Sequence, residues 1–521
     1  MPTRLEVRAP AELTLDGVIA WNAAHRPNDL ALDLGDPRRT HLVTWQELEA
    51  YIRAMSTDLP SALSPGQVVA VICDDGLGFH VISNALWRRG LTIALIDRTW
   101  GQSIISDLLE LTNSVLLLTN RWVKGFAERH VPMMEYPALR KSCKEPYITS
   151  ASLDGIAMYA TTSGTTSNPK CIPVTHRSIR TAYAACLNVH DFSNVRQAGC
   201  LFNLNSLGVF GVCYLLPREI GASTRCFPAF TMANISQSWR TLLASNVDFV
   251  YLVPPLVRLL NSLPPSQLQR VQPIRVFCAG APVKEEELRS LETRAPVRIY
   301  NCYGLTELTF AVFFGCRSPE DLACESIGFP YSVQARIVDV DDNVITGAGT
   351  GELHILGPMG TNGYLNNPSA TDESWQNGWL RTGDIAERDI SGRYFIRGRI
   401  KDVIIRGGVT YYLHEIEHYL RRAPGVIDAC AFRGRELPSG DELCVMAKVQ
   451  PGTLKADLVN WIRKEVGEGK VPNQLKLTEV DLPVSSNGKP LRNELRKQLM
   501  DPPLKNSRPS NRLETDRSTD K

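Results

Sequence analysis

The segment VVAVICDDGLGFHVISNALWRRGLTIALID, residues 68–97, decides the class of fold. It consists of an apolar run, an amphipathic stretch and a second apolar run, which predicts a strand, a helix and a parallel strand. The same alternation returns in VDFVYLVPP, residues 247–255, and in IRVFCAG, residues 274–280. Because parallel strands are joined by helices that cover the sheet, the sequence predicts parallel sheets with helices on their faces.

The pattern of apolar and turn residues changes after Ser326. Short candidate strands separated by turn residues, such as ARIVDV (335–340) and GELHILG (351–357), predict a small antiparallel or barrel unit. Farther on, HEIEHYLRRAPG (414–425) predicts a helix, and Thr453 is the predicted N-cap of another. These features indicate a separate small α+β domain near the C-terminus.

We therefore predict an α/β protein with a large N-terminal domain, built from two parallel-type α/β sheets plus a small β-barrel subdomain, and a small α+β C-terminal domain. The predicted boundaries are residues 1–400 and 401–502. Residues 503–521 are nearly all polar or proline and are predicted to form a disordered tail, because they cannot bury enough apolar surface to offset the entropy of ordering.

The composition of the chain limits the kinds of molecule that it is expected to bind. The 521 residues include 57 basic and 55 acidic side chains, for a net charge of +2, which argues against nucleic acid or an anionic membrane as the partner. The 13 cysteines contain no C-x-x-C pair, which is typical of a reducing compartment. No segment offers about 18 consecutive uncharged apolar residues, so we expect a cytoplasmic protein without a membrane span.

The sharpest local signal is TTSGTTSNPK, residues 161–170. Its hydroxyls, its glycine and Lys170 can supply side-chain and backbone donors to a polyphosphate. It does not have the G-x-x-x-x-G-K-[ST] form, because Cys171 and Ile172 follow the lysine. A solvated Ser/Thr loop would have the same composition, so this stretch alone leaves both interpretations open.

Four more motifs follow along the chain: NCYGLTE (301–307), RTGDIAERD (381–389), GRIKDVIIRGGVTYYLHEIE (398–417) and SSNGKPLR (485–492). The first combines an aromatic ring and an amide, which can contact a purine, with a carboxylate that can hold Mg²⁺. In the second, Asp384 is expected in a turn after Gly383 and can accept hydrogen bonds from two ribose hydroxyls. In the last, Lys489 follows an apparent tight turn. Taken singly, a strand end with a turn explains the first motif equally well, and a capping aspartate and a solvated lysine are the more common explanations of the second and the last.

The five motifs occur in the order found in the adenylate-forming superfamily, which includes acyl-CoA synthetases, nonribosomal-peptide adenylation domains and luciferases. The chain resembles that superfamily from about Thr14 to Arg496. The resemblance implies ATP and Mg²⁺ as cofactors and a small-molecule carboxylic acid as substrate. It also implies CoA, or the phosphopantetheine of an acyl or peptidyl carrier protein, as acceptor.

Individual residues of this chain correspond to the site residues of the superfamily. The phosphate loop corresponds to Thr162, Ser163, Gly164, Thr165, Thr166 and Lys170. Gly280, Ala281 and Pro282 correspond to the segment beside the adenine, and Asn301 and Tyr303 to residues that contact it. Thr306 corresponds to the residue at the α-phosphate, Glu307 to the magnesium ligand, and Asp384 and Arg399 to the residues at the ribose.

Two lysines correspond to residues with different roles. Lys401 falls at the hinge about which a mobile C-terminal domain, which forms a lid over AMP, rotates between two half-reactions. Lys489 corresponds to the lysine that touches both the substrate carboxylate and the α-phosphate. In the second half-reaction, the rotation would bring Gly407 and Gly408 to the tunnel for the nucleophile.

The sequence departs from the superfamily pattern in its phosphate loop and acyl site. Ser167 and Cys171 replace glycines, and a glycine position with positive φ would strain either side chain. Asn205 stands where many acyl- and aryl-CoA ligases carry histidine. No acidic residue to pair with a substrate amine lies between Asp191 and Glu219, which favours an uncharged acid over an amino acid.

The predicted acyl pocket includes Asn205, Phe210, Val253 and Leu305, whose apolar or small surroundings favour an aryl, alicyclic or medium aliphatic acid. We therefore expect an acid–thiol ligase that uses CoA. The alternatives are a stand-alone enzyme that loads a carrier protein or joins the acid to an amino acid amine in specialised-metabolite biosynthesis, and a degenerate binder without turnover. A dinucleotide enzyme is disfavoured, because no G-x-G-x-x-G follows a predicted strand.

Overall fold

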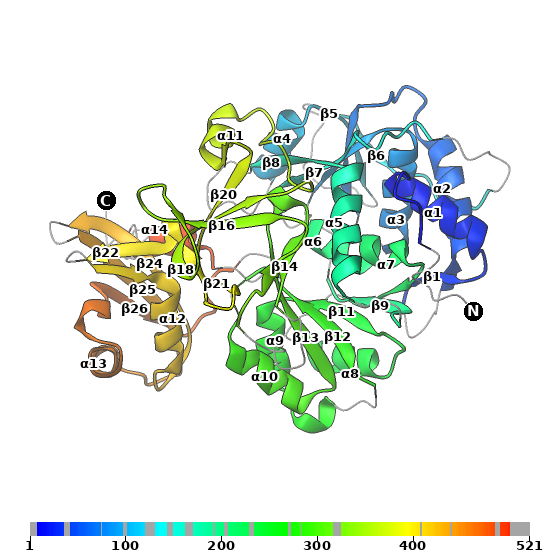
Figure 1. Cartoon of the computed structure of the whole chain (residues 1–521). Helices are drawn as coiled ribbons and strands as arrows, with labels where there is room; N and C mark the ends of the chain where they lie inside the picture. Colours follow the sequence, from blue (N-terminus) through cyan, green and yellow to red (C-terminus); the bar gives the residue numbers. More distant parts are fainter. Residues whose placement is uncertain are drawn as a thin grey trace, which may run out of the picture. The chain divides into compact units, whose positions relative to one another are not determined.

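Two compact units make up the chain, one running to Lys401 and the other beginning at Asp402 (Figure 1). The structure is a computed structural model that describes residues 8–35, 42–73, 76–96, 100, 102–119, 131–142, 149–161, 170–190, 192, 194–202, 207–228, 234–268, 272–281, 283–315, 325–406, 409–437, 440–484 and 490–500. The predicted disordered tail lies outside the described residues. None of the described helices is long and apolar enough to cross a membrane.

The first sheet of the larger unit has the strand order β6-β5-β3-β4-β7-β8, and all its neighbours are parallel except β7 and β8. Its strands are β3 (Val68–Ile72), β4 (Thr92–Leu95), β5 (Ser114–Thr119), β6 (Met133–Glu135), β7 (Ile156–Thr161) and β8 (Cys171–Thr175). Helix α3 (Gly76–Arg88) joins β3 to β4, which confirms the predicted strand, helix and parallel strand. The nearby helices are α2 (Trp45–Asp58), α4 (Gln102–Leu111) and α5 (His176–Val189).

A second sheet has the order β15-β14-β13-β12-β11-β9-β10-β1-β2 and is parallel from β13 to β1. Its strands are β1 (Leu30–Asp33), β2 (Leu42–Thr44), β9 (Gln197–Cys200), β10 (Ser223–Cys226), β11 (Phe249–Leu252), β12 (Ile274–Cys278), β13 (Val297–Gly304), β14 (Ala311–Phe314) and β15 (Phe329–Pro330). The helices of this part are α1 (Leu15–His25), α6 (Leu207–Phe210), α7 (Leu216–Glu219), α8 (Ile235–Leu243), α9 (Pro254–Asn261) and α10 (Glu285–Arg294), with a π-helical turn at Gly211–Leu215.

The third sheet is antiparallel, as the short strands after Ser326 predict. It contains β16 (Gln334–Val338), β17 (Val344–Ile345), β18 (Gly349–Leu356), β19 (Trp375–Gln376), β20 (Trp379–Arg388) and β21 (Tyr394–Arg399), with α11 (Pro368–Ser374) before β19. Buried apolar residues from all three sheets meet in one large core, and the remaining buried residues of the first sheet pack with α4 in a second cluster. The predicted α/β architecture of the large domain is therefore confirmed.

The unit that begins at Asp402 has its own core. Its strands are β22 (Val403–Arg406), β23 (Val409–Tyr412), β24 (Val426–Leu437), β25 (Gly440–Val449) and β26 (Gln474–Thr478), and its helices are α12 (Leu413–Arg422), α13 (Lys455–Glu465) and α14 (Arg492–Met500). The predicted cap of α13 is wrong. Leu454 is the N-cap, and the Thr453 hydroxyl instead donates to the Gln450 carbonyl at 2.8 Å.

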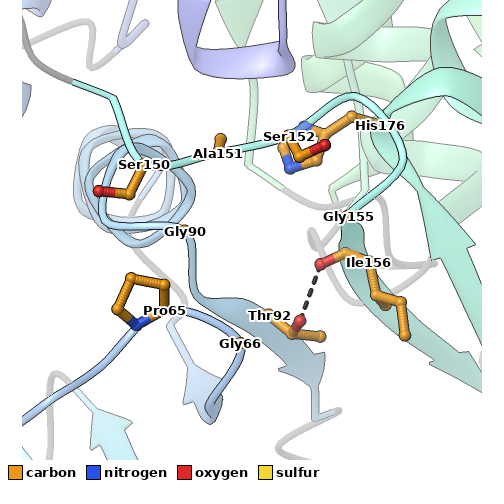
Figure 2. A pocket seen from close by; sticks show the side chains of 10 residues that line it. All are labelled: Pro65, Gly66, Gly90, Thr92, Ser150, Ala151, Ser152, Gly155, Ile156 and His176. Atoms are coloured by element: carbon orange, nitrogen blue, oxygen red, sulfur yellow. Dashed lines mark hydrogen bonds between the residues drawn. The ribbon is translucent and has the colours of Figure 1, made fainter.

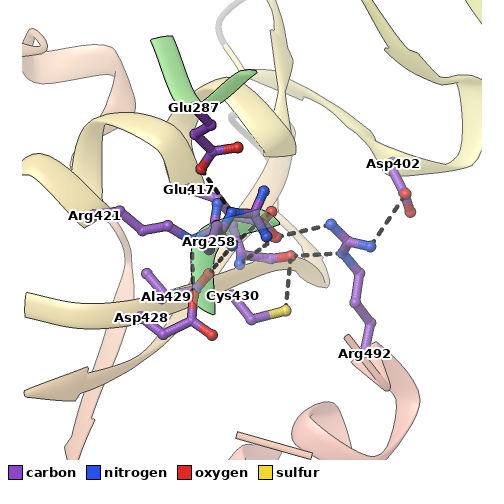
Figure 3. A network of polar contacts seen from close by, with 10 residues as sticks. Arg258, Glu287, Asp402, Glu417, Arg421, Asp428, Ala429, Cys430 and Arg492 are labelled. Carbon is purple, nitrogen blue, oxygen red and sulfur yellow. Dashed lines mark hydrogen bonds and ion pairs between the residues drawn. The ribbon is translucent and has the colours of Figure 1, made fainter. Parts of the chain in front are cut away.

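A buried carboxylate ties α14 to the rest of this unit (Figure 3). Only 5% of the Glu417 side chain is exposed, and Arg492 donates to it from Nη2 at 2.8 Å. Arg492 also donates from Nε to the Ala431 carbonyl at 3.0 Å and lies 3.3 Å from Asp402. Since Arg492 is the first residue of α14, these contacts place the start of the helix.

We expect Arg492→Met to destabilise the attachment of α14 by about 3 kcal/mol, because removing one partner of a buried ion pair leaves a carboxylate uncompensated. In the full-length protein, amide hydrogen exchange in α14 should accelerate about 10²-fold. Arg433→Met is the matched control, because Arg433 pairs with Asp441 at 2.6 Å while half of its side chain is exposed. Equal exchange rates in the two variants would contradict a stabilising role for Arg492.

Candidate functional site

Strands β7 and β8 form an antiparallel pair that brings Thr161 opposite Cys171. Residues 162–169, which include the predicted phosphate-loop residues Thr162, Ser163, Gly164, Thr165 and Thr166, lie outside the described residues, as does Ser167. Cys171 is buried in the extended strand β8 and is not among the residues with positive φ, so the strain considered for its side chain does not arise there. Lys170 immediately precedes this strand, and its Nζ lies 4.4 Å from the centre of the Tyr364 ring.

Glu307 lies in a short 3₁₀ helix, Thr306–Leu308, that follows β13. Its carboxylate accepts a hydrogen bond from the Tyr364 hydroxyl at 2.8 Å. Burial raises the pKa of Tyr364, the charge of Glu307 raises it further, and the Arg399 guanidinium opposes these effects. The Tyr364 hydroxyl therefore stays protonated at neutral pH and donates to Glu307.

The segment around Tyr364 connects Glu307 to the end of the β7–β8 pair. The Thr361 amide donates to the Glu307 carbonyl at 2.9 Å, and the Leu365 amide donates to the Cys171 carbonyl at 2.8 Å. Tyr364 lies outside the five sequence motifs. Its only local signal is an aromatic residue after Gly363 in TNGYLNNP, which does not indicate its partner in Glu307.

Asp384 is the centre of a second cluster. Its Oδ2 accepts from the Tyr303 hydroxyl at 2.6 Å and its Oδ1 from Arg399 Nε at 2.7 Å. Burial, followed by the charge of Asp384, raises the pKa of Tyr303 well above its usual range, so this hydroxyl is also a donor. Only 4% of Asp384 is exposed.

The expectation that Asp384 lies in a turn is wrong. Asp384 is inside β20, opposite Arg399 of β21. The pairing with β18 shifts register across Glu352 and His354, and Gly383 takes φ of +69° there. A β-bulge at a glycine thus produces the local turn signal without ending the strand.

The predicted adenine-contacting residues lie at the carboxyl ends of neighbouring parallel strands. Asn301 of β13 is opposite Cys278 of β12. Gly280 follows Cys278 by two residues along the chain. The Asn301 amide group donates to the carbonyls of Glu325 at 3.0 Å and Ser326 at 3.3 Å. Gly280 has φ of +96°, a conformation that favours glycine. Ala281 follows it, and Pro282 lies outside the described residues.

The predicted acyl-pocket residues differ in exposure. Phe210 is fully buried and packs edge-on against Phe79 at a ring distance of 4.8 Å. Val253 is buried at the start of α9, and Leu305 is half-buried between β13 and the 3₁₀ helix that holds Glu307. Asn205 lies outside the described residues.

Of the two predicted lysines, the structure describes Lys401. Lys401 is exposed in the 3₁₀ turn Ile400–Asp402, at the boundary between the two units. Lys489, Gly407 and Gly408 lie outside the described residues.

The chemistry of Glu307 fits a magnesium ion that is bound together with phosphates. Among the described residues, no three His, Cys, Asp or Glu side chains are grouped to form a metal cage. Magnesium is usually held by one or two carboxylates plus substrate phosphates. A single carboxylate close to Lys170 and the β7–β8 pair meets that requirement.

A cavity of about 300 Å³ lies in another part of the larger unit (Figure 2). Glycines and hydroxyl side chains line it together with His176, and its lining includes none of the predicted site residues. The His176 Nδ1 accepts from the Leu15 amide, and burial lowers the His176 pKa to about 4, so the ring is neutral. Without a charged side chain in its lining, this cavity is poorly suited to a nucleotide's phosphates.

Comparison with known families decides the class of this protein. The AMP-binding enzyme family matches residues 19–365, and the C-terminal domain of AMP-binding enzymes matches residues 415–489. The chain belongs to the AMP-binding enzyme family. The predicted membership of the adenylate-forming superfamily is confirmed, and the protein is a ligase.

The relatives of this AMP-binding enzyme include CoA ligases. Sulfoacetate–CoA ligase of Cupriavidus necator is 29% identical over 64% of this chain and 66% of its own length, so less than two thirds of that ligase is matched. Feruloyl-CoA synthase of an Amycolatopsis species is 28% identical over 88% of this chain and 94% of its own. The o-succinylbenzoate CoA synthetase of Bacillus subtilis, solved with an acyl-adenylate, has 22% identity and a TM-score of 0.80, covering 92% of this chain and 97% of its own.

Proposed function

We propose that this AMP-binding enzyme is an acid–CoA ligase that works through an acyl-adenylate. The observation that carries the proposal is the Asp384 cluster, in which a buried carboxylate is held by Tyr303 and Arg399. Its two oxygens are suited to the two hydroxyls of a ribose. Glu307 follows Tyr303 by four residues, so the residues proposed for the ribose and for the magnesium adjoin in one unit.

In the first half-reaction, an oxygen of the substrate carboxylate attacks the α-phosphorus of ATP. A bond forms between that oxygen and phosphorus, the bond to the bridging oxygen breaks, and pyrophosphate leaves. We assign Lys170, Thr306 and the hydroxyls of residues 162–166 to the phosphates, and Gly280, Ala281, Pro282 and Asn301 to the adenine side. Magnesium held by Glu307 would offset charge on the phosphate oxygens.

Lys489 is assigned to the developing charge at the reacting carboxylate and α-phosphate. An ammonium with an ordinary pKa of about 10.4 stays protonated at neutral pH, so Lys489 would stabilise charge and would not act as a base. In the second half-reaction, the sulfur of CoA attacks the acyl carbon, AMP leaves, and the thiol proton passes to solvent.

The proposal also names the acceptor of the acyl group and the class of acid. Two relatives that match this chain are named for CoA thioester formation, which supports CoA over a carrier protein. For the acid, we propose an uncharged aryl, alicyclic or medium aliphatic acid, held near Asn205, Phe210, Val253 and Leu305.

We also propose that residues 1–400 hold both substrates, that residues 401–502 form a lid, and that the lid turns about Lys401. Proline fixes φ and removes a backbone donor, so Lys401→Pro should restrict this rotation. We expect the variant to form thioester about tenfold more slowly or worse, which corresponds to a barrier for that step raised by about 1.4 kcal/mol. Its acid-dependent pyrophosphate exchange should stay within about twofold of the unsubstituted protein. Equal loss of both half-reactions would argue against a hinge at this position.

The direct test is to incubate the full-length protein with Mg-ATP and a panel of aryl, alicyclic, fatty and amino acids. Hydroxylamine traps the activated acyl group as a hydroxamate, and mass spectrometry then detects the thioester when CoA is added. Hydroxamate with thioester would support the whole proposal. Hydroxamate without thioester would move the acceptor to a carrier protein or an amine, and no hydroxamate with any acid would favour a binder without turnover.

A further inference from the structure

Tyr364 touches two oppositely charged groups with different parts of its side chain. The face of its ring lies under the Lys170 ammonium, and its hydroxyl donates to the Glu307 carboxylate. An ammonium over an aromatic face and a carboxylate that accepts from a phenol are both favourable contacts. Each charged group thus has a neutral partner in the same residue.

The two charged groups do not pair with each other. Within the described part of the chain, neither Lys170 nor Glu307 has an ion-pair partner. A lysine and a carboxylate in direct contact would satisfy each other and would need to separate before either could hold a ligand. The tyrosine contacts both groups, the lysine through its ring and the carboxylate through its hydroxyl.

The position of Tyr364 is fixed by its neighbours. The Tyr364 amide donates to the Thr371 hydroxyl at 2.9 Å, and its ring packs edge-on against Trp375 at 5.2 Å. At Gly363, which has φ of +140°, an added Cβ would lie 2.5 Å from Thr371 Cγ2. The backbone therefore approaches α11 closely at this glycine, and this approach sets the direction of the tyrosine.

We propose that Tyr364 is a positioning residue that holds Lys170 and Glu307 apart, so that the lysine is free for the phosphates of ATP and the carboxylate for magnesium. This inference rests on the proposed function. It adds a residue that touches neither the nucleotide nor the metal but determines how both are bound.

Two substitutions separate the two contacts of Tyr364. Tyr364→Phe keeps the ring under Lys170 and removes the hydrogen bond to Glu307. Loss of a group that orients a metal ligand typically weakens metal binding about 10–100-fold, so we expect at least a tenfold rise in the half-saturating metal concentration. ATP affinity at saturating metal should change less than about twofold, because the ring remains in place.

Tyr364→Leu removes both contacts and allows Lys170 to pair directly with Glu307. We expect this variant to lose metal affinity as Tyr364→Phe does, and also to bind ATP about tenfold more weakly, because the phosphates must displace an ion pair. Tyr51→Phe is the matched control. The Lys141 ammonium lies over the Tyr51 ring at 5.3 Å, in a pair that contains none of the site residues.

The experiment measures binding and turnover in the full-length proteins. Calorimetry with the α,β-methylene analogue of ATP, which cannot be cleaved between those phosphates, gives nucleotide affinity, and the electron paramagnetic resonance signal of Mn²⁺ gives metal affinity in its presence. The expected result is a metal defect alone in Tyr364→Phe and a combined defect in Tyr364→Leu, with Tyr51→Phe unchanged.

The inference is overturned if Tyr364→Phe binds Mn²⁺ as the unsubstituted protein does, or if the two variants show the same losses together with a lowered melting temperature. Pyrophosphate release is measured in parallel. If the unsubstituted protein binds the analogue but releases no pyrophosphate with any acid, the proposed function fails, whereas the binding measurements still decide the role of Tyr364.

Discussion

Lys489→Ala is expected to lower acid-dependent ATP–pyrophosphate exchange by about 10²–10³-fold, because one preorganised contact to a developing charge is worth roughly 3–4 kcal/mol. ATP binding should change much less, since the proposed contact strengthens only as charge builds in the transition state. Exchange measured at saturating ATP and acid checks this expectation.

Lys497→Ala is the matched control for this lysine. Lys497 is an exposed residue of α14, eight positions farther along the chain, and its loss should leave exchange within about twofold because exposed surface substitutions have small effects. Supplying preformed acyl-adenylate should restore thioester formation in Lys489→Ala. Near-normal exchange in Lys489→Ala would remove the residue from the reacting centre.

Asp384→Ala should raise the KM for ATP by at least about 10²-fold, because two hydrogen bonds to a charged acceptor, each worth roughly 1.5–3 kcal/mol, would be lost. The substitution also leaves Tyr303 and Arg399 without the carboxylate that they share. The specific signature is the comparison of ATP with its 2′,3′-dideoxy analogue. The unsubstituted enzyme should discriminate strongly between them, and the variant should not.

Asp389→Asn provides the control for Asp384, because Asp389 accepts from backbone amides in the turn after β20 and pairs with Arg393. This variant should keep both ATP affinity and discrimination against the dideoxy nucleotide. A comparison of melting temperatures shows whether Asp384→Ala is folded. Retained discrimination in folded Asp384→Ala would place the ribose elsewhere.

The elements that the sequence predicted best are those with a local pattern. Buried parallel strands such as β3 and β4 are continuous apolar runs, and a helix shows its periodicity within its own residues. The two errors concern exact positions. Thr453 is a favourable N-cap by residue type, but its hydroxyl is used in the preceding turn, and Gly383 marks a bulge inside a strand that local pattern does not distinguish from a loop.

The candidate site was predicted as a set of residue types and not as a set of contacts. The motifs selected Tyr303 because a ring can contact a purine, Glu307 because a carboxylate can hold Mg²⁺, and Asp384 because a carboxylate can accept from ribose hydroxyls. That Tyr303 donates to Asp384, 81 residues away, depends on how β13 and the antiparallel sheet pack together. Tyr364 was not predicted because its contact with Glu307, 57 residues away, also depends on tertiary packing.

The sequence by itself determined the class of fold, the family and the residue types of the site, because hydrophobic periodicity and motif order are properties of neighbouring residues. Only the tertiary structure decided which side chains meet: Arg399 with Asp384 across a shifted register, Tyr364 with both Lys170 and Glu307, and Arg492 with Glu417. Such contacts join segments far apart in the chain. Strand register and side-chain packing select them, and neither leaves a local pattern in the sequence.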